Sequence, residues 1–295
     1  MLASAAWASL VAAPVMRAMV FLSTGDPNFN TTEPAGLLAG SGWRLVGTWG
    51  GFQGTPVGPH HFLAAHHIGG AIGDPFVLNG VAYKTTAFTD DPASDLRIWK
   101  IDGAFPSWAV LYRGRAEVGR AFVVFGRGLT RGPEVIVNNV LKGWQWGAGD
   151  GRLRWGRNVF VSAVDRHGSW GVLLYAAFAP GGDVNEADLA SGDSSAPLFI
   201  RDGTGWKLAG IAAAVDSYFA TSDSGPGFIA SLFDSRGLYY SPTPPTGWKQ
   251  INGTAPVPSG FYSTRISVRA DWIDSVVAPR EAGAPTGPKS PLAAP

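Results

Sequence analysis

The sequence predicts an all-β fold in a single large domain, and three observations support this. The chain has 295 residues, including 40 Gly and 22 Pro, and only 15% are charged. Such a composition favours many turns and few long solvated helices. Short apolar or alternating runs recur between the turn residues, without a strand–helix alternation and without an internal repeat. Closely spaced strands are typical of a β-sandwich or β-barrel, which can reach this length as one domain.

The predicted strands are short, rich in aromatic and β-branched residues, and bounded by Gly or Pro. Residues 33–42 and 239–253 are rich in Gly and Pro and are expected to be loops. In chain order the predicted strands are Trp43–Trp49, Thr55–Ala65, Asp95–Ile101, Arg120–Phe125, Asn158–Val164, Trp170–Ala177, Pro197–Ile200, Trp206–Ala214 and Gly227–Leu232.

One helix is predicted, close to the C-terminus. Ser267 is a suitable N-cap, and Pro279 would end the helix. Residues 280–295 are rich in Pro, Ala and Gly and are expected to form a disordered tail. The apolar face of the helix, at 3.6-residue spacing, consists of Val268, Trp272, Ile273, Val276 and Val277.

Composition excludes several functions. The formal net charge is +1 at pH 7, so nucleic acid is not an expected partner. The chain has no Cys, which excludes disulfides, zinc–thiolate sites and a catalytic thiol. Hydrophobic residues make up 45% of the chain, as in an ordinary globular protein.

The N-terminus resembles a secretory leader. Residues 2–16 are small and apolar and contain A-x-A triplets, so residues 1–14 are predicted to be a signal peptide or its remnant. This predicts a secreted or extracytoplasmic protein. The segment lacks a basic n-region, and a loose N-terminal helix is the alternative. No other stretch reaches the roughly 18 apolar residues of a membrane span.

The segment from Ala190 to Phe199, ASGDSSAPLF, is the most informative part of the chain. A nucleophilic serine needs a sharply held hydroxyl beside backbone N–H donors that can stabilise an oxyanion. Gly192, two residues before Ser194, would let the N–H groups of both residues converge. Asp193 is placed to anchor the loop from behind. A Gly-Asp-Ser tripeptide is also a common turn sequence.

The run from Gly192 to Leu198 resembles the G-D-S-G-G-P-L segment of trypsin-like serine proteases. The resemblance implies that Ser194 is the nucleophile and that the N–H groups of Gly192 and Ser194 form the oxyanion hole. Ser195 and Ala196 stand where the family has glycines. If either position requires a positive φ, the substitution costs about 1 kcal/mol or more.

A second resemblance covers residues 54–68, which are similar to the family's G-T-L-I-x-P-x-x-V-L-T-A-A-H-C. In this register His67 matches the catalytic histidine and Ile68 replaces a cysteine. A neighbouring register would make His66 catalytic, but it misaligns Pro59 and the pair Phe62-Leu63.

The histidines also allow a metal-site interpretation. His60, His61, His66 and His67 are potential ligands. Adjacent residues on a strand point to opposite faces, so no more than two of the four would readily converge. No carboxylate lies nearby in sequence, and no metal is expected.

The third element of the resemblance is Asp95–Ile101, which alternates strictly and is similar to the family's D-I-A-L-L-K-L. The resemblance implies that Asp95 orients His67, because a buried carboxylate holds the imidazole tautomer. Asp90 and Asp91 are interpreted as turn residues. The order His67, Asp95, Ser194 is that of chymotrypsin and differs from the subtilisin and α/β-hydrolase orders.

The resemblance extends from Thr48 to Val277 and implies two antiparallel six-stranded β-barrels with a C-terminal helix. The barrels would cover roughly residues 15–115 and 116–266, and the closing helix residues 267–278. Residues 206–212 resemble the strand that lines the substrate cleft, and residues 225–229 the strand that follows it. The absence of cysteine suggests a bacterial type without disulfides. No I-V-G-G-like segment precedes the domain, so activation by propeptide cleavage is not indicated.

The substrate pocket implied by the resemblance contains Asp188, Ala213 and Gly227. Asp188 lies six residues before Ser194, where an acidic residue would favour Arg or Lys before the cleaved bond. It could equally belong to a differently shaped loop at Val184–Ala190, and Ala212–Val215 lacks the family's S-W-G edge.

The function implied is that of a serine endopeptidase acting through an acyl-enzyme, with a polypeptide substrate, no cofactor and a monomeric state. Two other classes remain open. The altered pair Ser195-Ala196 suggests a catalytically inactive binding module at the cell surface. The tryptophans Trp144, Trp146, Trp155 and Trp170 suggest a carbohydrate-binding platform.

Overall fold

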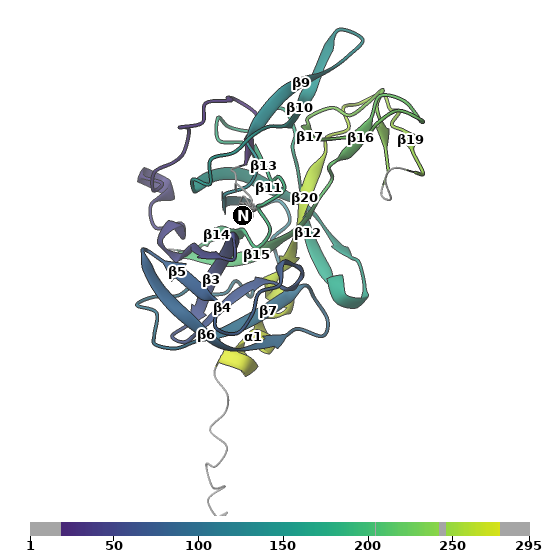
Figure 1. Ribbon diagram of the computed structural model, residues 1–295. Helices are drawn as coiled ribbons and strands as arrows, with labels where there is room; N and C mark the ends of the chain where they lie inside the picture. Colours follow the sequence, from purple (N-terminus) through teal and green to yellow (C-terminus); the bar gives the residue numbers. More distant parts are fainter. Residues whose placement is uncertain (1–18, 204, 242–245, 278–295) are drawn as a thin grey trace, which may run out of the picture.

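The computed structural model describes residues 19–203, 205–241 and 246–277. They form two closed six-stranded antiparallel barrels, a further six-stranded sheet and a short C-terminal helix (Figure 1). The prediction of an all-β fold with two barrels and a closing helix is confirmed. The predicted signal peptide at residues 1–14 and the predicted tail at 280–295 lie outside the described residues. No helix among the described residues is long and apolar enough to span a membrane.

The first barrel is closed around an aromatic core. The rings of Phe62 and Phe76 stack with their centroids 4.0 Å apart, and those of Trp49 and Trp99 lie 4.6 Å apart. All four side chains are almost completely buried, so this cluster supplies much of the apolar area that stabilises the barrel. Its strands, in spatial order, are β2 (Gly47–Trp49), β3 (Phe52–Gly58), β4 (His61–Ala65), β7 (Leu96–Ile101), β6 (Val81–Asp90) and β5 (Pro75–Leu78).

The second barrel has an aliphatic and phenylalanine core that includes Phe122, Phe160 and Phe261. The N-terminal strand β1 (Val20–Phe21) pairs with β13 (Ala187–Asp188) on the side of this barrel. The strands of the barrel, in spatial order, are β11 (Arg154–Asp165), β12 (Val172–Ala177), β20 (Gly260–Arg265), β15 (Gly205–Val215), β14 (Pro197–Asp202) and β8 (Ala121–Gly126).

The further six-stranded sheet, here called the added sheet, stands outside both barrels. It joins a hairpin that precedes β11 to the segment that connects β15 with β20. In Figure 1 it forms the part of the molecule farthest from the first barrel, with the β9–β10 hairpin projecting at the top. Its strands, in spatial order, are β19 (Lys249–Gln250), β18 (Tyr239–Tyr240), β16 (Tyr218–Ala220), β17 (Phe228–Leu232), β10 (Val140–Trp146) and β9 (Arg131–Val137).

The added sheet corrects one strand assignment. Residues 225–229 were expected to follow β15 within the second barrel, but β17 belongs to the added sheet and β20 completes the barrel. β17 pairs with β10 and β16, whereas β20 pairs with β12 and β15, and glycine is needed in β20 because a Cβ at Gly260 would lie 2.1 Å from the carbonyl oxygen of Ala176.

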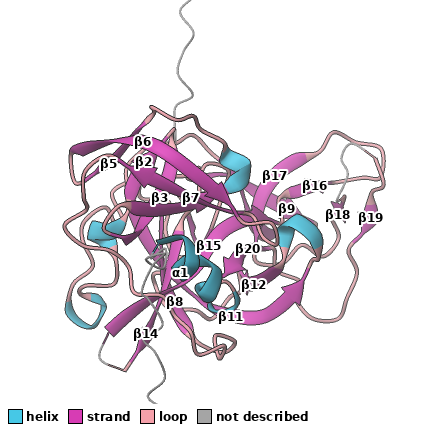
Figure 2. Ribbon diagram, turned by 90° about the horizontal axis from the view of Figure 1, so that it is seen from below, coloured by secondary structure: helices cyan, strands magenta, loops and turns pink. Residues whose placement is uncertain are grey.

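The two barrels share a hydrophobic cluster that the C-terminal segment covers. Leu63 and Ile98 of the first barrel join Phe199 and Ile211 of the second, and Ile273 of the helix α1 (Ala270–Val277) joins both. Figure 2 shows α1 across this junction. The helix therefore fastens the two barrels to each other.

The start of the helix differs from the prediction. A 3-10 turn (Ile266–Val268) precedes α1, and the Ser267 hydroxyl donates to Glu117 instead of capping the helix. Glu117 is completely buried and also accepts from Arg265. A buried carboxylate without hydrogen-bond donors is costly in free energy, which explains why the Ser267 hydroxyl bonds to Glu117. Val277 packs so closely on β3 that a Cβ at Gly58 would lie 2.3 Å from it.

Several strand boundaries also differ from the prediction. Trp43–Leu45 is a 3-10 turn, and 3-10 turns also form at Gly36–Leu38 and Gly168–Trp170. The single strand predicted over residues 55–65 is a hairpin of β3 and β4, turning at Pro59-His60.

Candidate active site

The three residues predicted as a triad form one hydrogen-bonded chain. His67 Nδ1 lies 2.6 Å from Asp95 Oδ2, and His67 Nε2 lies 2.9 Å from Ser194 Oγ. The second carboxylate oxygen of Asp95 accepts from the His67 backbone N–H at 2.9 Å. Asp95 is buried, with 5% of its surface exposed, so water does not compete for the carboxylate. This arrangement can transfer a proton from Ser194 to His67.

The first barrel brings His67 and Asp95 together. β4 and β7 are antiparallel neighbours, and Ala65 pairs with Leu96 at the point where β4 ends and β7 begins. His67 lies on the 3-10 turn (His66–Ile68) that follows β4, and Asp95 immediately precedes β7. The His66 N–H donates to the Asp95 carbonyl at 3.1 Å. The end of one strand and the start of its neighbour therefore lie at the same sheet edge.

The other histidines lie apart from this chain. His66 Nε2 is 3.7 Å from Asp90 on the exposed side of the turn, and Asp90 also pairs with Arg97. His60 Nδ1 lies near the carbonyl of Gly103. Within the described ranges, no three His, Asp or Glu side chains are grouped so as to hold a metal ion.

Asp193 anchors the loop that carries Ser194. Its carboxylate accepts from Gly128 N at 2.6 Å and from Ala190 N at 2.9 Å. Glycine is required where the carboxylate packs on the end of β8, because a Cβ at Gly126 would lie 2.2 Å from Asp193 Oδ1. Only 1% of Asp193 is exposed, and this burial raises its pKa to about 7.

The backbone of this loop leaves the amides on either side of Asp193, and that of Ser191, without an acceptor among the described residues. Asp193 N donates to Ala190 O, Ser195 N to Ala212 O and Ala196 N to Asp193 O. Among the described residues, the N–H groups of Gly192 and Ser194 have no acceptor. Gly192 has a φ of +92°, which glycine adopts without strain. Two unused donors beside a serine hydroxyl are what an oxyanion hole requires.

Ser195 occupies one of the positions where the family has glycine, and its backbone is left-handed, with a φ of +68°. Its hydroxyl accepts from the Ala65 N–H at the end of β4, and the residue is fully buried. The serine therefore carries the expected strain but gains a hydrogen bond to the first barrel. The sequence indicated the strain and gave no sign of the hydrogen bond.

Gln53 makes a second contact between the barrels that sequence reasoning missed. With its amide assigned from the hydrogen-bond network, its nitrogen donates to Ser194 O at 2.8 Å and its oxygen accepts from Arg127 N at 2.8 Å. Gln53 is completely buried on β3. A polar residue within a buried strand was the available signal, because such residues are buried only when hydrogen-bonded.

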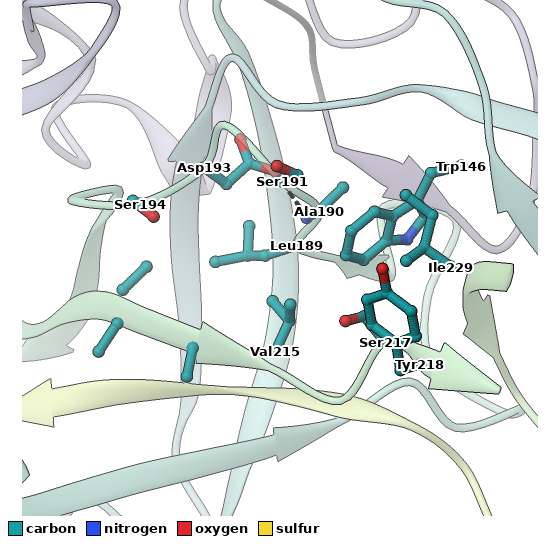
Figure 3. A pocket seen from close by; sticks show the side chains of 13 residues that line it. Trp146, Leu189, Ala190, Ser191, Asp193, Ser194, Val215, Ser217, Tyr218 and Ile229 are labelled. Carbon is teal, nitrogen blue, oxygen red and sulfur yellow. Dashed lines mark hydrogen bonds between the residues drawn. The ribbon is translucent and has the colours of Figure 1, made fainter. Parts of the chain in front are cut away.

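A pocket opens beside Ser194 (Figure 3). Its volume is about 400 Å³. Figure 3 shows Ser194 at one end and Trp146, Tyr218 and Ile229 at the other. The loop before the nucleophile and the end of β15 supply the remaining walls. The complete lining is Trp146, Leu189, Ala190, Ser191, Asp193, Ser194, Ala212, Ala213, Ala214, Val215, Ser217, Tyr218 and Ile229.

Of the three predicted pocket residues, only Ala213 lines this cavity. Gly227 lies just before β17 against the ring of Trp248. Asp188 pairs with Val20 through the backbone, is 1% exposed, and accepts from Leu189 N at 3.0 Å. Desolvation raises the pKa of Asp188 to about 8.

The tryptophans expected as an alternative platform do not share one surface. Trp144 is buried against Phe178 and under the Arg131 guanidinium. Trp146 lines the pocket, whereas Trp170 is partly exposed with its ring 6.4 Å from that of His67.

Comparison with known proteins identifies the fold. No protein-family model matches the chain, and no curated protein matches it in sequence. Among solved structures it is similar to mouse neuropsin, a serine protease expressed in the limbic system of the brain. The TM-score is 0.50 at 14% identity, over 80% of this chain and 96% of neuropsin. The chain therefore has the two-barrel fold of chymotrypsin.

Proposed function

We propose that this protein is a serine endopeptidase. The observation that carries the proposal is the continuous hydrogen-bonded chain from Asp95 through His67 to Ser194. The two unused N–H groups at Gly192 and Ser194, the adjacent pocket and the protease fold support it.

In the proposed mechanism, Ser194 Oγ attacks the peptide carbonyl while His67 Nε2 takes its proton. Asp95 holds His67 in the tautomer with the proton on Nδ1 and stabilises the imidazolium that forms. The N–H groups of Gly192 and Ser194 donate to the oxyanion. His67 then protonates the leaving amine. Water attacks the acyl-enzyme while His67 takes its proton, and the proton passes to Ser194 Oγ as the acyl group is released. No cofactor takes part in these steps.

The proposed substrate is a polypeptide, and the protein is proposed to act as a monomer outside the cytoplasm. The leader-like residues 2–16 support export. The chain contains no cysteine, so outside the cytoplasm its fold has to be stable without disulfides.

A fluorophosphonate probe tests the proposal, because it labels only an activated serine. We expect stoichiometric labelling of the folded protein, with the modified peptide containing Ser194. Ser194→Ala should abolish labelling, and His67→Ala should lower its rate by a factor of 10³ or more, on the order found for such triads. His66→Ala is the matched control and should label like the unmodified protein.

The result that would contradict the proposal is a folded protein that remains unlabelled. It would favour the alternative of an inactive binding module, since the triad geometry would then lack a reactive hydroxyl. Loss of labelling in His66→Ala but not in His67→Ala would show that His66, and not His67, is the base.

A further inference from the structure

The wall of the pocket farthest from Ser194 comes from the added sheet, which lies outside both barrels. Trp146 belongs to β10, Tyr218 to β16, and Ile229 to β17. Tyr218 and Ile229 are register partners in neighbouring strands, so their side chains lie side by side on one face. Figure 3 shows these three side chains together, opposite Ser194.

This wall is held in place by its own sheet. β10 pairs with β17 through Gln145 and Ala230, which flank Trp146 and Ile229 in sequence. The Trp146 indole Nε1 donates to Ser231 Oγ at 3.0 Å, which fixes the ring. A preformed wall loses little conformational entropy when a ligand enters.

The described residues that line the pocket offer no free charged group to pair with a charged side chain of a substrate. Among the described lining residues there is no Lys, Arg or His, and the only carboxylate, that of Asp193, is already bonded to Gly128 N and Ala190 N. Asp188 lies behind the pocket, next to the lining residue Leu189, but it is only 1% exposed, does not line the cavity, and burial raises its pKa to about 8. Burying an unpaired charge is costly, whereas apolar side chains gain from contact with Leu189, Val215 and Ile229.

We infer that the added sheet sets the specificity of the enzyme for substrates with a large uncharged apolar side chain, aromatic or aliphatic, before the cleaved bond. The part of this inference that concerns cleavage rests on the proposed function. The inference also predicts binding selectivity that does not depend on catalysis. A volume of about 400 Å³ is within the range of pockets that enclose a small ligand.

The first test compares tetrapeptide anilides that differ only in the last residue, Phe, Leu, Arg or Glu. We expect kcat/KM for Phe and Leu to exceed the values for Arg and Glu by about 100-fold or more. Ile229→Ala should lower kcat/KM for the Phe substrate by about tenfold or more. Ile136→Ala removes the same atoms from an exposed site on β9 of the same sheet and should change nothing.

The second test separates this inference from the proposed function. Calorimetry measures the binding of the corresponding free-acid peptides, ending in Phe or Arg, to the Ser194→Ala protein. Tighter binding of the Phe peptide, weakened in Ser194→Ala/Ile229→Ala and not in Ser194→Ala/Ile136→Ala, supports the pocket assignment even if the protein is inactive. Preferred cleavage after Arg or Glu by a protein shown to react with the fluorophosphonate probe, or tighter binding of the Arg peptide, overturns the inference. Fluorophosphonate labelling decides the proposed function independently.

Discussion

Ser195 combines a conformational cost with a cross-barrel contact. A non-glycine residue at a φ of +68° is strained by about 1 kcal/mol, but its hydroxyl binds Ala65 N of the other barrel. Because His67 follows Ala65 by two residues and Ser194 precedes Ser195, this bond joins the two halves of the candidate triad. Ser195 is thus a positioning residue in the proposed enzyme.

Two substitutions at this position separate strain from positioning. Ser195→Ala and Ser195→Gly both delete the hydroxyl, but only alanine keeps the strain. We expect urea denaturation to show Ser195→Ala less stable than Ser195→Gly by about 1 kcal/mol. Both should slow fluorophosphonate labelling to a similar extent. Equal free energies of unfolding would show that Ser195 is not strained. An unchanged labelling rate would show that the bond to Ala65 N does not position Ser194.

Asp95 gives a second prediction for a single residue. Asp95→Asn preserves shape but presents an amide to His67 Nδ1, which favours the wrong tautomer. We expect kcat to fall by about 10⁴-fold while the melting temperature changes little. Asp90→Asn, which alters the carboxylate near His66, is the control and should retain activity. A loss of similar size in both variants would indicate a general effect of negative charge.

At the scale of single residues, the sequence motifs indicated which side chains lie close together. His67, Asp95 and Ser194 lie together as expected from three separate segments. The motifs did not indicate Gln53, whose partners are backbone groups of the other barrel. They left the position of Asp188 open, and in the structure it pairs with Val20 and is buried. Such contacts depend on tertiary packing, and local sequence carries little information about them.

The loop before the nucleophile depends on the end of β8. Gly126→Ala would place a Cβ 2.2 Å from Asp193 Oδ1, so the carboxylate would have to leave its two backbone donors. We expect a loss of about 1–3 kcal/mol in the free energy of unfolding, together with much slower labelling of Ser194. Gly205→Ala is the control, since a Cβ there meets no atom within 4 Å. Normal labelling of Gly126→Ala would show that the loop does not need this anchor.

Among elements, the barrel strands were easier to anticipate than the added sheet. The largely buried strands β7 (Leu96–Ile101) and β14 (Pro197–Asp202) carry large apolar side chains on both faces, so they stand out in sequence. Strands β18 and β19 have two residues each and lie in a stretch rich in Gly and Pro, where a loop was expected. They exist because neighbouring strands supply partners, which sequence periodicity cannot reveal.

Three buried carboxyls influence the stability of the whole molecule. Burial raises the pKa of Glu186 and Asp188 to about 8 and that of Asp193 to about 7. The unfolded chain releases these protons near pH 4. Between these values the folded state binds more protons, so the free energy of unfolding falls as pH rises from about 4 to about 8 and then levels off. Urea denaturation at pH 5, 6.5 and 8 measures this slope.

Asp188→Asn provides the control for this pH dependence. The variant should lose part of the slope, because its amide does not titrate. The lowered pKa of His61, which burial causes, acts in the opposite direction below about pH 6.5, so the difference between the two proteins is the informative quantity. An identical slope in the variant would mean that Asp188 ionises normally in the fold.

The bond between Ala65 N and Ser195 Oγ also makes one amide a reporter of barrel separation. The donor belongs to the first barrel and the acceptor to the second, so the Ala65 proton can exchange with deuterated solvent only when the barrels part locally or the protein unfolds. Amides within a barrel ladder report on that barrel alone. Comparing the exchange rate of Ala65 with those of Leu63 and Leu198 would therefore measure how often the two halves of the cleft separate in the intact protein.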